Sequence, residues 1–110
     1  MVGIHCIYDI NDIPNEIIND SIQLKDFFEK ICVDNNLTVI NKMFHAFTPY
    51  GFTGIFLLSE SHLSFHTWPE NNSIYIDIFS CNTNLNTSKL LNDILEYFKT
   101  NKYKMKILDR

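Results

Sequence analysis

The sequence predicts an α+β fold, a two-layer sandwich in which two helices cover one face of a mainly antiparallel sheet. Three observations carry this prediction. Runs with alternating apolar and polar residues, typical of half-buried strands, occur at residues 61–68 and 74–81. Two segments instead repeat their apolar residues every three or four positions, which is typical of amphipathic helices. Strands also follow one another directly in the middle of the chain, which favours hairpins over βαβ units.

The predicted elements follow the chain in the order β-α-β-β-β-β-α-β. Asp12 can cap the first helix, with Pro14 in its first turn, where a missing N–H group is tolerated. This helix closes at the polar segment 34–36, and Thr87 can cap the second helix, which runs to Phe98. Strands are expected at residues 2–8, 37–47, 54–60, 61–68, 74–81 and 104–108.

The strands at 61–68 and 74–81 show the most regular alternation. Successive side chains on a strand point to opposite faces, so one face of the first strand carries His62, Ser64, His66 and Trp68. One face of the second strand carries Tyr75, Asp77, Phe79 and Cys81. The densest cluster of reactive side chains falls in this region and consists of Glu60, Ser61, His62, His66, Glu70, Asp77 and Cys81.

Composition and charge indicate a single domain, residues 1–110, without a nucleic-acid partner. Hydrophobic residues make up 45% of the 110 positions, enough for a packed core. The net charge of −4 offers no basic surface for DNA or RNA, but it accommodates a cationic small molecule. A chain this short leaves much surface uncovered, and one layer of helices leaves one sheet face bare, so we expect a dimer.

The three cysteines, Cys6, Cys32 and Cys81, show no close pairing and no CxxC spacing. Such a sparse, odd set is typical of a reducing compartment, so we expect a cytoplasmic protein. The N-terminus lacks a basic region followed by an apolar run, and no apolar stretch approaches the roughly 20 residues that span a bilayer. We therefore expect neither a signal peptide nor a membrane partner.

The pattern disfavours two chemistries for this region. His62, His66 and Cys81 could form a metal-ligand set, but residues four apart on a strand are separated by about 13 Å, whereas a zinc–nitrogen bond measures about 2.1 Å. We therefore expect no metal. A serine or cysteine hydrolase is disfavoured because the chain has no GxSxG turn and no cysteine-protease signature.

Residues 58–70, with the sequence LSESHLSFHTWPE, resemble the processing-site segment of the small prokaryotic S-adenosylmethionine decarboxylases. The segment DIFSC at residues 77–81 resembles the stretch that follows in that family at the same distance. Upstream, FHAFTPYG at residues 44–51 also resembles the family, as does, more loosely, GIH at residues 3–5. The resemblance covers nearly the whole chain.

The resemblance implies that the chain cleaves itself. The Ser61 hydroxyl attacks the carbonyl of Glu60 and converts the amide into an ester, and β-elimination then separates chain 1–60 from chain 61–110. Hydrolysis of the resulting dehydroalanine leaves a pyruvoyl group, the covalent cofactor, at position 61. His66 matches the family's processing base, a task that suits a near-neutral imidazole.

The resemblance also implies roles in substrate chemistry. The pyruvoyl carbonyl forms a Schiff base with the substrate amine and acts as an electron sink when CO2 leaves. Cys81 matches the family's proton donor, which suits a thiol because an ordinary thiol is protonated at pH 7. Glu70 matches the carboxylate that holds the ribose hydroxyls, and Phe47 matches a ring that stacks on adenine. Thr53 stands where many members have serine, and its hydroxyl assists processing.

On this interpretation, the chain decarboxylates S-adenosylmethionine for spermidine synthesis. It acts as a homodimer of processed protomers, with two sheets packed face to face and the active site near that interface. Two alternatives stay open. The same scaffold could decarboxylate arginine or ornithine, because Tyr75, Asn82 and the Asn71-Asn72 turn depart from the family pattern. The chain could also be a non-catalytic homologue that binds nucleosides or regulates a partner enzyme.

Overall fold

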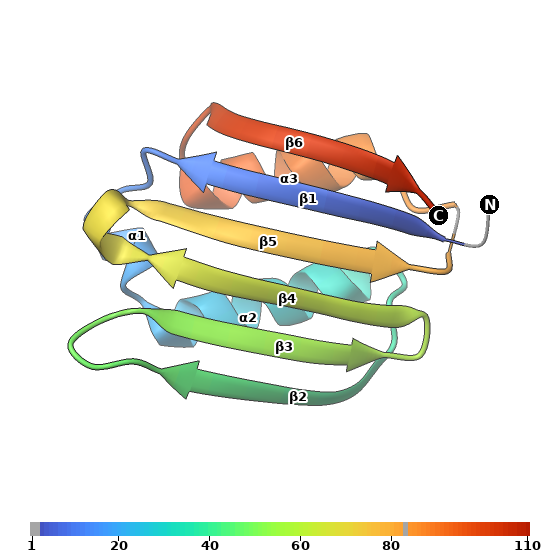
Figure 1. The fold of residues 1–110 in the computed structure, drawn as a ribbon, viewed down its shortest axis with the longest axis horizontal. Helices are drawn as coiled ribbons and strands as arrows, with labels where there is room; N and C mark the ends of the chain where they lie inside the picture. The colour runs from blue at the N-terminus through green and yellow to red at the C-terminus, as the bar shows by residue number, and fades with distance from the viewer. Residues whose placement is uncertain (1–2, 83) are drawn as a thin grey trace.

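The fold has two layers, a six-stranded antiparallel sheet and a layer of helices (Figure 1). The computed structural model describes residues 3–82 and 84–110. The strands lie in the order β2-β3-β4-β5-β1-β6. The α+β class and the antiparallel sheet are thus confirmed, while Val2 of the first predicted strand lies outside the described residues. The elements are β1 (Ile4–Asn11), α1 (Asn15–Ile18), α2 (Ser21–Asp34), β2 (Val39–Ala46), β3 (Phe52–Leu58), β4 (Ser61–Trp68), the 3-10 helix η1 (Pro69–Asn71), β5 (Ser73–Ser80), α3 (Thr87–Phe98) and β6 (Lys102–Asp109).

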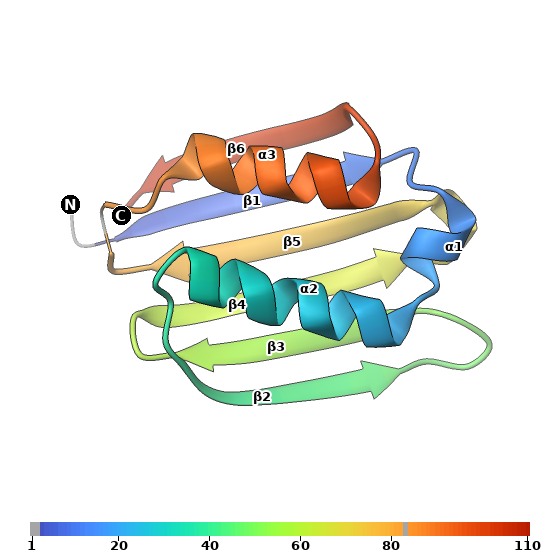
Figure 2. The same cartoon turned by 180° about the vertical axis from the view of Figure 1, so that it is seen from behind.

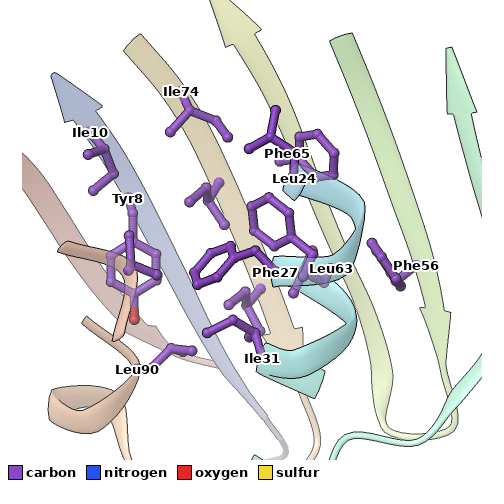
Figure 3. Close-up of a cluster of buried hydrophobic side chains, with 14 of the residues drawn as sticks. Tyr8, Ile10, Leu24, Phe27, Ile31, Phe56, Leu63, Phe65, Ile74 and Leu90 are labelled. Carbon is purple, nitrogen blue, oxygen red and sulfur yellow. The ribbon is translucent and has the colours of Figure 1, made fainter. Parts of the chain in front are cut away.

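The hydrophobic core lies between the sheet and the helices, all of which cover the same face (Figure 2). Phe28 of α2 stacks on Phe65 of β4, with ring centroids 4.3 Å apart. Tyr8 of β1 and Leu63 of β4 point into the same layer toward the helices (Figure 3). Burial of each such side chain stabilises the fold by about 1.5–3 kcal/mol. The packed core therefore holds the sheet, and with it the residues on the opposite face, in a fixed arrangement.

The first predicted helix is wrong in its extent, because the structure divides it into α1 and α2. The Asp20 side chain accepts a hydrogen bond from the N–H of Gln23 at 3.1 Å and so begins a new helix. Asp12 does not act as a cap: its φ is +57°, and α1 begins only at Asn15, after Pro14 and without a side-chain cap. A strong capping residue inside the apolar repeat therefore interrupts the helix that the repeat predicts.

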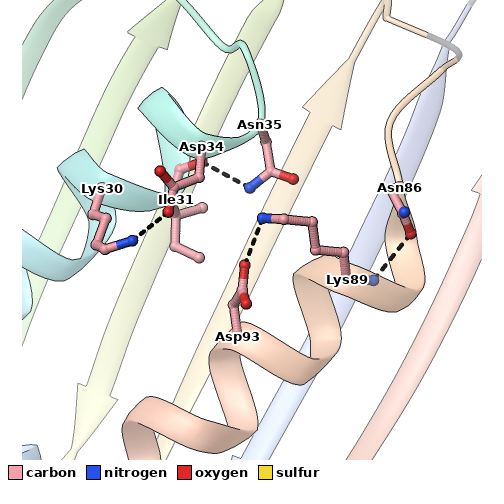
Figure 4. Close-up of polar contacts among 7 residues, drawn as sticks. All are labelled: Lys30, Ile31, Asp34, Asn35, Asn86, Lys89 and Asp93. Atoms are coloured by element: carbon pink, nitrogen blue, oxygen red, sulfur yellow. Dashed lines mark hydrogen bonds and ion pairs between the residues drawn. The ribbon is translucent and has the colours of Figure 1, made fainter.

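The second predicted helix is confirmed as α3, although its cap is one residue earlier than expected. The Asn86 side chain accepts from the N–H of Lys89 at 3.0 Å, so Thr87 is the first helical residue and not the cap (Figure 4). Lys89 also pairs with Asp93 one turn later, at 2.9 Å. Among the helices of the described residues, none is long and apolar enough to cross a membrane.

The opposite face of the sheet is not covered by any of the described helices and is turned toward the viewer in Figure 1. Large apolar side chains are exposed there, with exposed fractions of 74% for Met43, 50% for Ile55 and 51% for Leu57. Met43 lies opposite Ile55 in the register, and Leu57 lies opposite His62. The apolar residues and the reactive side chains of β4 therefore share the uncovered face.

Candidate active site

Most of the residues predicted for the site lie on strand β4 or next to one of its ends. Its alternation is confirmed: Leu63 and Phe65 are buried toward the helices, whereas His62 and His66 lie on the uncovered face. Ser61 and His66 are five residues apart on this strand, and a strand rises about 3.3 Å per residue, so they are separated by about 16 Å. The two residues belong to separate clusters, one at each end of β4.

The Ser61 cluster consists of Glu60, Ser61, His62 and Cys81. Ser61 has a φ of +148°, which residues with a side chain rarely adopt, so the turn between β3 and β4 is strained at this residue. Ser61 lies opposite Ser80 in the register, which places the next residue, Cys81, beside Glu60. The N–H of Cys81 donates to the Glu60 carbonyl oxygen at 2.8 Å. The peptide bond between Glu60 and Ser61 thus joins a carbonyl polarised by a hydrogen bond to a residue in a strained backbone conformation.

Two side chains of the Ser61 cluster are placed for chemistry. Oγ of Ser61 lies 3.1 Å from Nδ1 of His62, within hydrogen-bond distance. The Cys81 thiol is exposed, whereas the thiols of Cys6 and Cys32 are buried. Burial raises the pKa of the Cys32 thiol to about 11. Of the three thiols, Cys81 is thus the one that a small molecule can reach.

The Glu60 carboxylate ties the turn to the loop that precedes β2. It accepts hydrogen bonds from the Ser59 hydroxyl and from the N–H of Thr38, the latter at 2.9 Å. These bonds, with that from Ser59 contributing most, hold the pKa of the Glu60 carboxyl below its usual value. The N–H of Ser59 in turn donates to the Thr38 carbonyl at 2.9 Å. The two residues that precede the strained Ser61 are therefore both tied to Thr38.

The His66 cluster lies at the other end of β4 and surrounds a pocket. Thr53 is opposite His66 in the register, and its hydroxyl forms a hydrogen bond with Nδ1 of His66. The His66 ring also lies 4.3 Å from Trp68 and 5.6 Å from Phe47, measured between ring centroids. The pocket has a volume of about 260 Å³ and is lined by Phe47, Tyr50, Gly51, His66, Thr67, Trp68 and Glu70.

The predicted site residues thus fall into two groups. The Ser61 cluster contains three of them: Glu60, Ser61 and Cys81. The His66 cluster contains the other four: Phe47, Thr53, His66 and Glu70. Within one chain, His66 lies too far from Ser61 to act on it, although the resemblance implies that it does.

The sequence did not indicate the contacts of two further residues, His62 and Trp68. The period of two places both on the same face as His66, but it does not show what they touch. Asp77, also on this face, pairs with His5, with Oδ1 3.2 Å from Nε2. Within residues 3–82 and 84–110, no group of three or more His, Cys, Asp or Glu side chains lies close enough together to hold a metal ion.

In fold, the chain is similar to a class of decarboxylases. It matches the crystal structure of the adenosylmethionine decarboxylase from Aquifex aeolicus with a TM-score of 0.89 and 26% sequence identity, over 99% of this chain and 90% of that chain. The chain is 34% identical over 110 residues to the S-adenosylmethionine decarboxylase proenzyme of Archaeoglobus fulgidus, covering 100% of this chain and 98% of the relative. It is 39% identical over 101 residues to the proenzyme of the same name from Clostridium kluyveri, covering 88% and 77%. The S-adenosylmethionine decarboxylase family model matches residues 4–110, so the chain belongs to this family and the resemblance is confirmed.

Proposed function

We propose that this chain is a proenzyme that cleaves itself between Glu60 and Ser61 and then decarboxylates S-adenosylmethionine with the resulting pyruvoyl group. The observation that carries the proposal is the peptide bond between these residues, which is strained at Ser61 and polarised by the N–H of Cys81. Strain is released when this bond breaks, and a polarised carbonyl is a better electrophile. The family of the chain and the proenzymes among its relatives support the same reaction.

Cleavage proceeds in two stages. In the first, Oγ of Ser61 attacks the Glu60 carbonyl carbon and the C–N bond breaks, which leaves an ester and a free amino group. In the second, a base removes the α-proton of residue 61 and its Cβ–O bond breaks, so that the main-chain carboxylate of Glu60 leaves and dehydroalanine remains. Addition of water and loss of ammonia then give the pyruvoyl group. The products are chains 1–60 and 61–110.

The second stage requires a homodimer. His66 is the predicted base, and about 16 Å of strand separates it from Ser61 of its own chain. A second copy packed sheet to sheet would bring the His66 cluster of one protomer onto the Ser61 cluster of its partner. The apolar side chains of Met43, Ile55 and Leu57 on the uncovered face would supply the buried contact. Each dimer then contains two equivalent active sites, both built from two protomers.

The His66 cluster suits the nucleoside part of S-adenosylmethionine. The rings of Phe47 and Trp68 provide faces for adenine, and the Glu70 carboxylate accepts hydrogen bonds from the ribose hydroxyls. Such rings also attract the sulfonium cation. Arginine or ornithine would leave the two rings and Glu70 without partners. The lining of the pocket therefore favours the nucleoside substrate.

Decarboxylation then needs an electron sink and a proton. The pyruvoyl group supplies a carbonyl that takes up the electron pair left by CO2. The exposed thiol of Cys81, next to Ser80 that lies opposite residue 61, donates the proton to the carbon that loses CO2. The product carries an aminopropyl group for spermidine synthesis, and the free thiols of the chain fit a cytoplasmic enzyme.

Mass spectrometry of the intact protein, followed by CO2 release, tests the proposal. Purified protein should give two fragments, 1–60 and 61–110, with the second lacking the N-terminal amine. Carboxyl-labelled S-adenosylmethionine should release CO2, whereas labelled arginine and ornithine should not. A single chain that stays intact on prolonged incubation would exclude the enzyme, and release from arginine or ornithine alone would exclude the substrate.

A further inference from the structure

We propose that His62 is the base of the first stage of self-cleavage, accepting the Ser61 hydroxyl proton while His66 of the partner subunit serves only the second stage. This inference rests on the proposed function, because it divides the two stages of cleavage between two histidines. The geometry points to it: Nδ1 of His62 lies 3.1 Å from Oγ of Ser61, the distance at which a general base takes a proton. With Nδ1 as the acceptor, the ring carries its proton on Nε2.

The surroundings of His62 leave its ring available for Ser61. Its cross-strand neighbours in the register are Leu57 of β3 and Phe79 of β5, both apolar. The nearby carboxylate of Asp77 is engaged by His5 at 3.2 Å. The hydrogen bond found for the His62 ring among the described residues is the one to Ser61. His62 is itself exposed, so its ring has a packing role smaller than that of a core residue.

The atoms of the first stage balance with residues of one chain. Nδ1 of His62 takes the proton as Oγ of Ser61 bonds to the Glu60 carbonyl carbon. The N–H of Cys81, 2.8 Å from the carbonyl oxygen, holds the negative charge that forms there. The imidazolium of His62 then returns the proton to the Ser61 nitrogen as the C–N bond breaks. The ester and the free amine result without any group from a second chain.

His66 cannot replace His62 in this stage within one chain. It lies about 16 Å along β4, and its Nδ1 is bound to the hydroxyl of Thr53. Removal of His66 should therefore leave a chain that forms the ester and stops. Removal of His62 as well should slow the formation of this ester.

Hydroxylamine distinguishes the ester from the amide, because it cleaves an ester but leaves an amide intact. The His66→Ala protein should yield a hydroxamate of fragment 1–60 and a fragment that begins with serine, both measured by mass. The His62→Ala/His66→Ala protein should form the cleavable ester roughly 100-fold more slowly, the usual contribution of a general base. Added imidazole should restore the rate, because it can enter the space left by an exposed side chain. The His45→Ala/His66→Ala protein is the matched control, with another exposed histidine removed and ester formation unchanged.

The outcomes separate this inference from the proposed function. An intact wild-type chain would overturn self-cleavage itself. A cleaving wild type combined with equal ester formation in His66→Ala and His62→Ala/His66→Ala would overturn the role of His62 alone. A His66→Ala protein that forms no ester would also overturn it, because the first stage would then need His66. Equal thermal unfolding midpoints of the variants would show that the slower rate reflects chemistry and not folding. A folded double variant whose ester formation imidazole does not restore would contradict the inference and assign His62 a structural role.

Discussion

The two ends of strand β4 differ in what they are made of. The end at Ser61 is held by backbone hydrogen bonds and by the Glu60 carboxylate, and it contains the strained residue of the turn. The end at His66 consists of side chains, with the rings of Phe47, Tyr50 and Trp68 and the Glu70 carboxylate around a pocket. In the proposed function, the first end breaks a peptide bond and the second binds the nucleoside part of the substrate.

The length of the strand keeps these two ends apart. A β-strand is nearly inextensible, so no rotamer change can bring His66 to Ser61 across about 16 Å. In the proposed homodimer, a second copy packed on the uncovered apolar face would place its His66 beside Ser61 of the first copy. A homodimer with a twofold axis joins opposite ends twice, because each contact between two different patches occurs in duplicate.

Mixing two inactive variants gives the largest expected effect. Ser61→Ala has no nucleophile and His66→Ala has no base for elimination, so each protein alone should remain one uncleaved chain. When both are expressed together, the His66→Ala chain should be cleaved, because its Ser61→Ala partner contributes an intact His66. The measurement is the mass of each chain after co-purification, with the two variants distinguished by a tag.

Co-expression of two tagged His66→Ala chains is the control for this mixture and should give no fragments. If the mixed sample also stays uncleaved although the two tags co-purify, the ends of β4 do not act across the interface. The comparison between the two clusters would then have to be explained by a rearrangement within one chain.

Much of the sheet and of the site could be predicted from the sequence. The alternation of apolar residues placed His62 and His66 on one face and Leu63 and Phe65 on the other, as the structure confirms. The rise of about 3.3 Å per residue on a strand sets the distance between Ser61 and His66. The same rise per residue disfavoured a metal site at His62 and His66. Once residues 61–68 are predicted to be a strand, the separation of Ser61 and His66 therefore follows from the sequence.

The remaining features depend on contacts distant in sequence. The hydrogen bond from Cys81 to Glu60 exists because of the β4–β5 register, which the sequence did not specify. The break before α2 arises because the Asp20 side chain captures the N–H of Gln23, a local bond that competes with the apolar repeat. Neither the strained φ of Ser61 nor the hydrogen bond between Thr53 and His66 had a signal in the residue pattern.

Substitutions in the pocket should lower the activity on the substrate and leave the rate of self-cleavage unchanged. Glu70→Gln removes the negative charge at the pocket but keeps the shape, and we expect kcat/KM for S-adenosylmethionine to fall by roughly 10- to 100-fold, as for loss of a charged hydrogen bond. Fragments 1–60 and 61–110 should still form at the wild-type rate. Steady-state kinetics on the cleaved protein measures the effect, and slower cleavage would show that the two clusters are not separate in function.

A substitution in the core should weaken both ends together. Gly54 lies opposite Phe65 in the register, and a Cβ at this position would meet the Phe65 ring at 2.4 Å and the Phe44 ring at 2.8 Å. Gly54→Ala should therefore lower the free energy of unfolding by about 1–3 kcal/mol, the usual cost of overpacking. Urea unfolding of the uncleavable Ser61→Ala protein, with and without this change, provides the value. An unchanged midpoint would mean that the two rings move aside without cost.

The smallest effect concerns the carboxylate that holds the Ser61 end. Hydrogen bonds from Ser59 and Thr38 lower the pKa of Glu60, so the folded state binds this proton less readily than the unfolded chain. The stabilisation is present above the unfolded pKa and is lost as the pH falls through the lower folded value. Glu60→Gln in the Ser61→Ala background should thus unfold at a lower urea concentration at pH 7, and the difference should shrink below about pH 4.5. The pocket variant Glu70→Gln serves as the control, and a difference for Glu60→Gln that grows toward acid pH would contradict the role of the charged carboxylate in holding the turn.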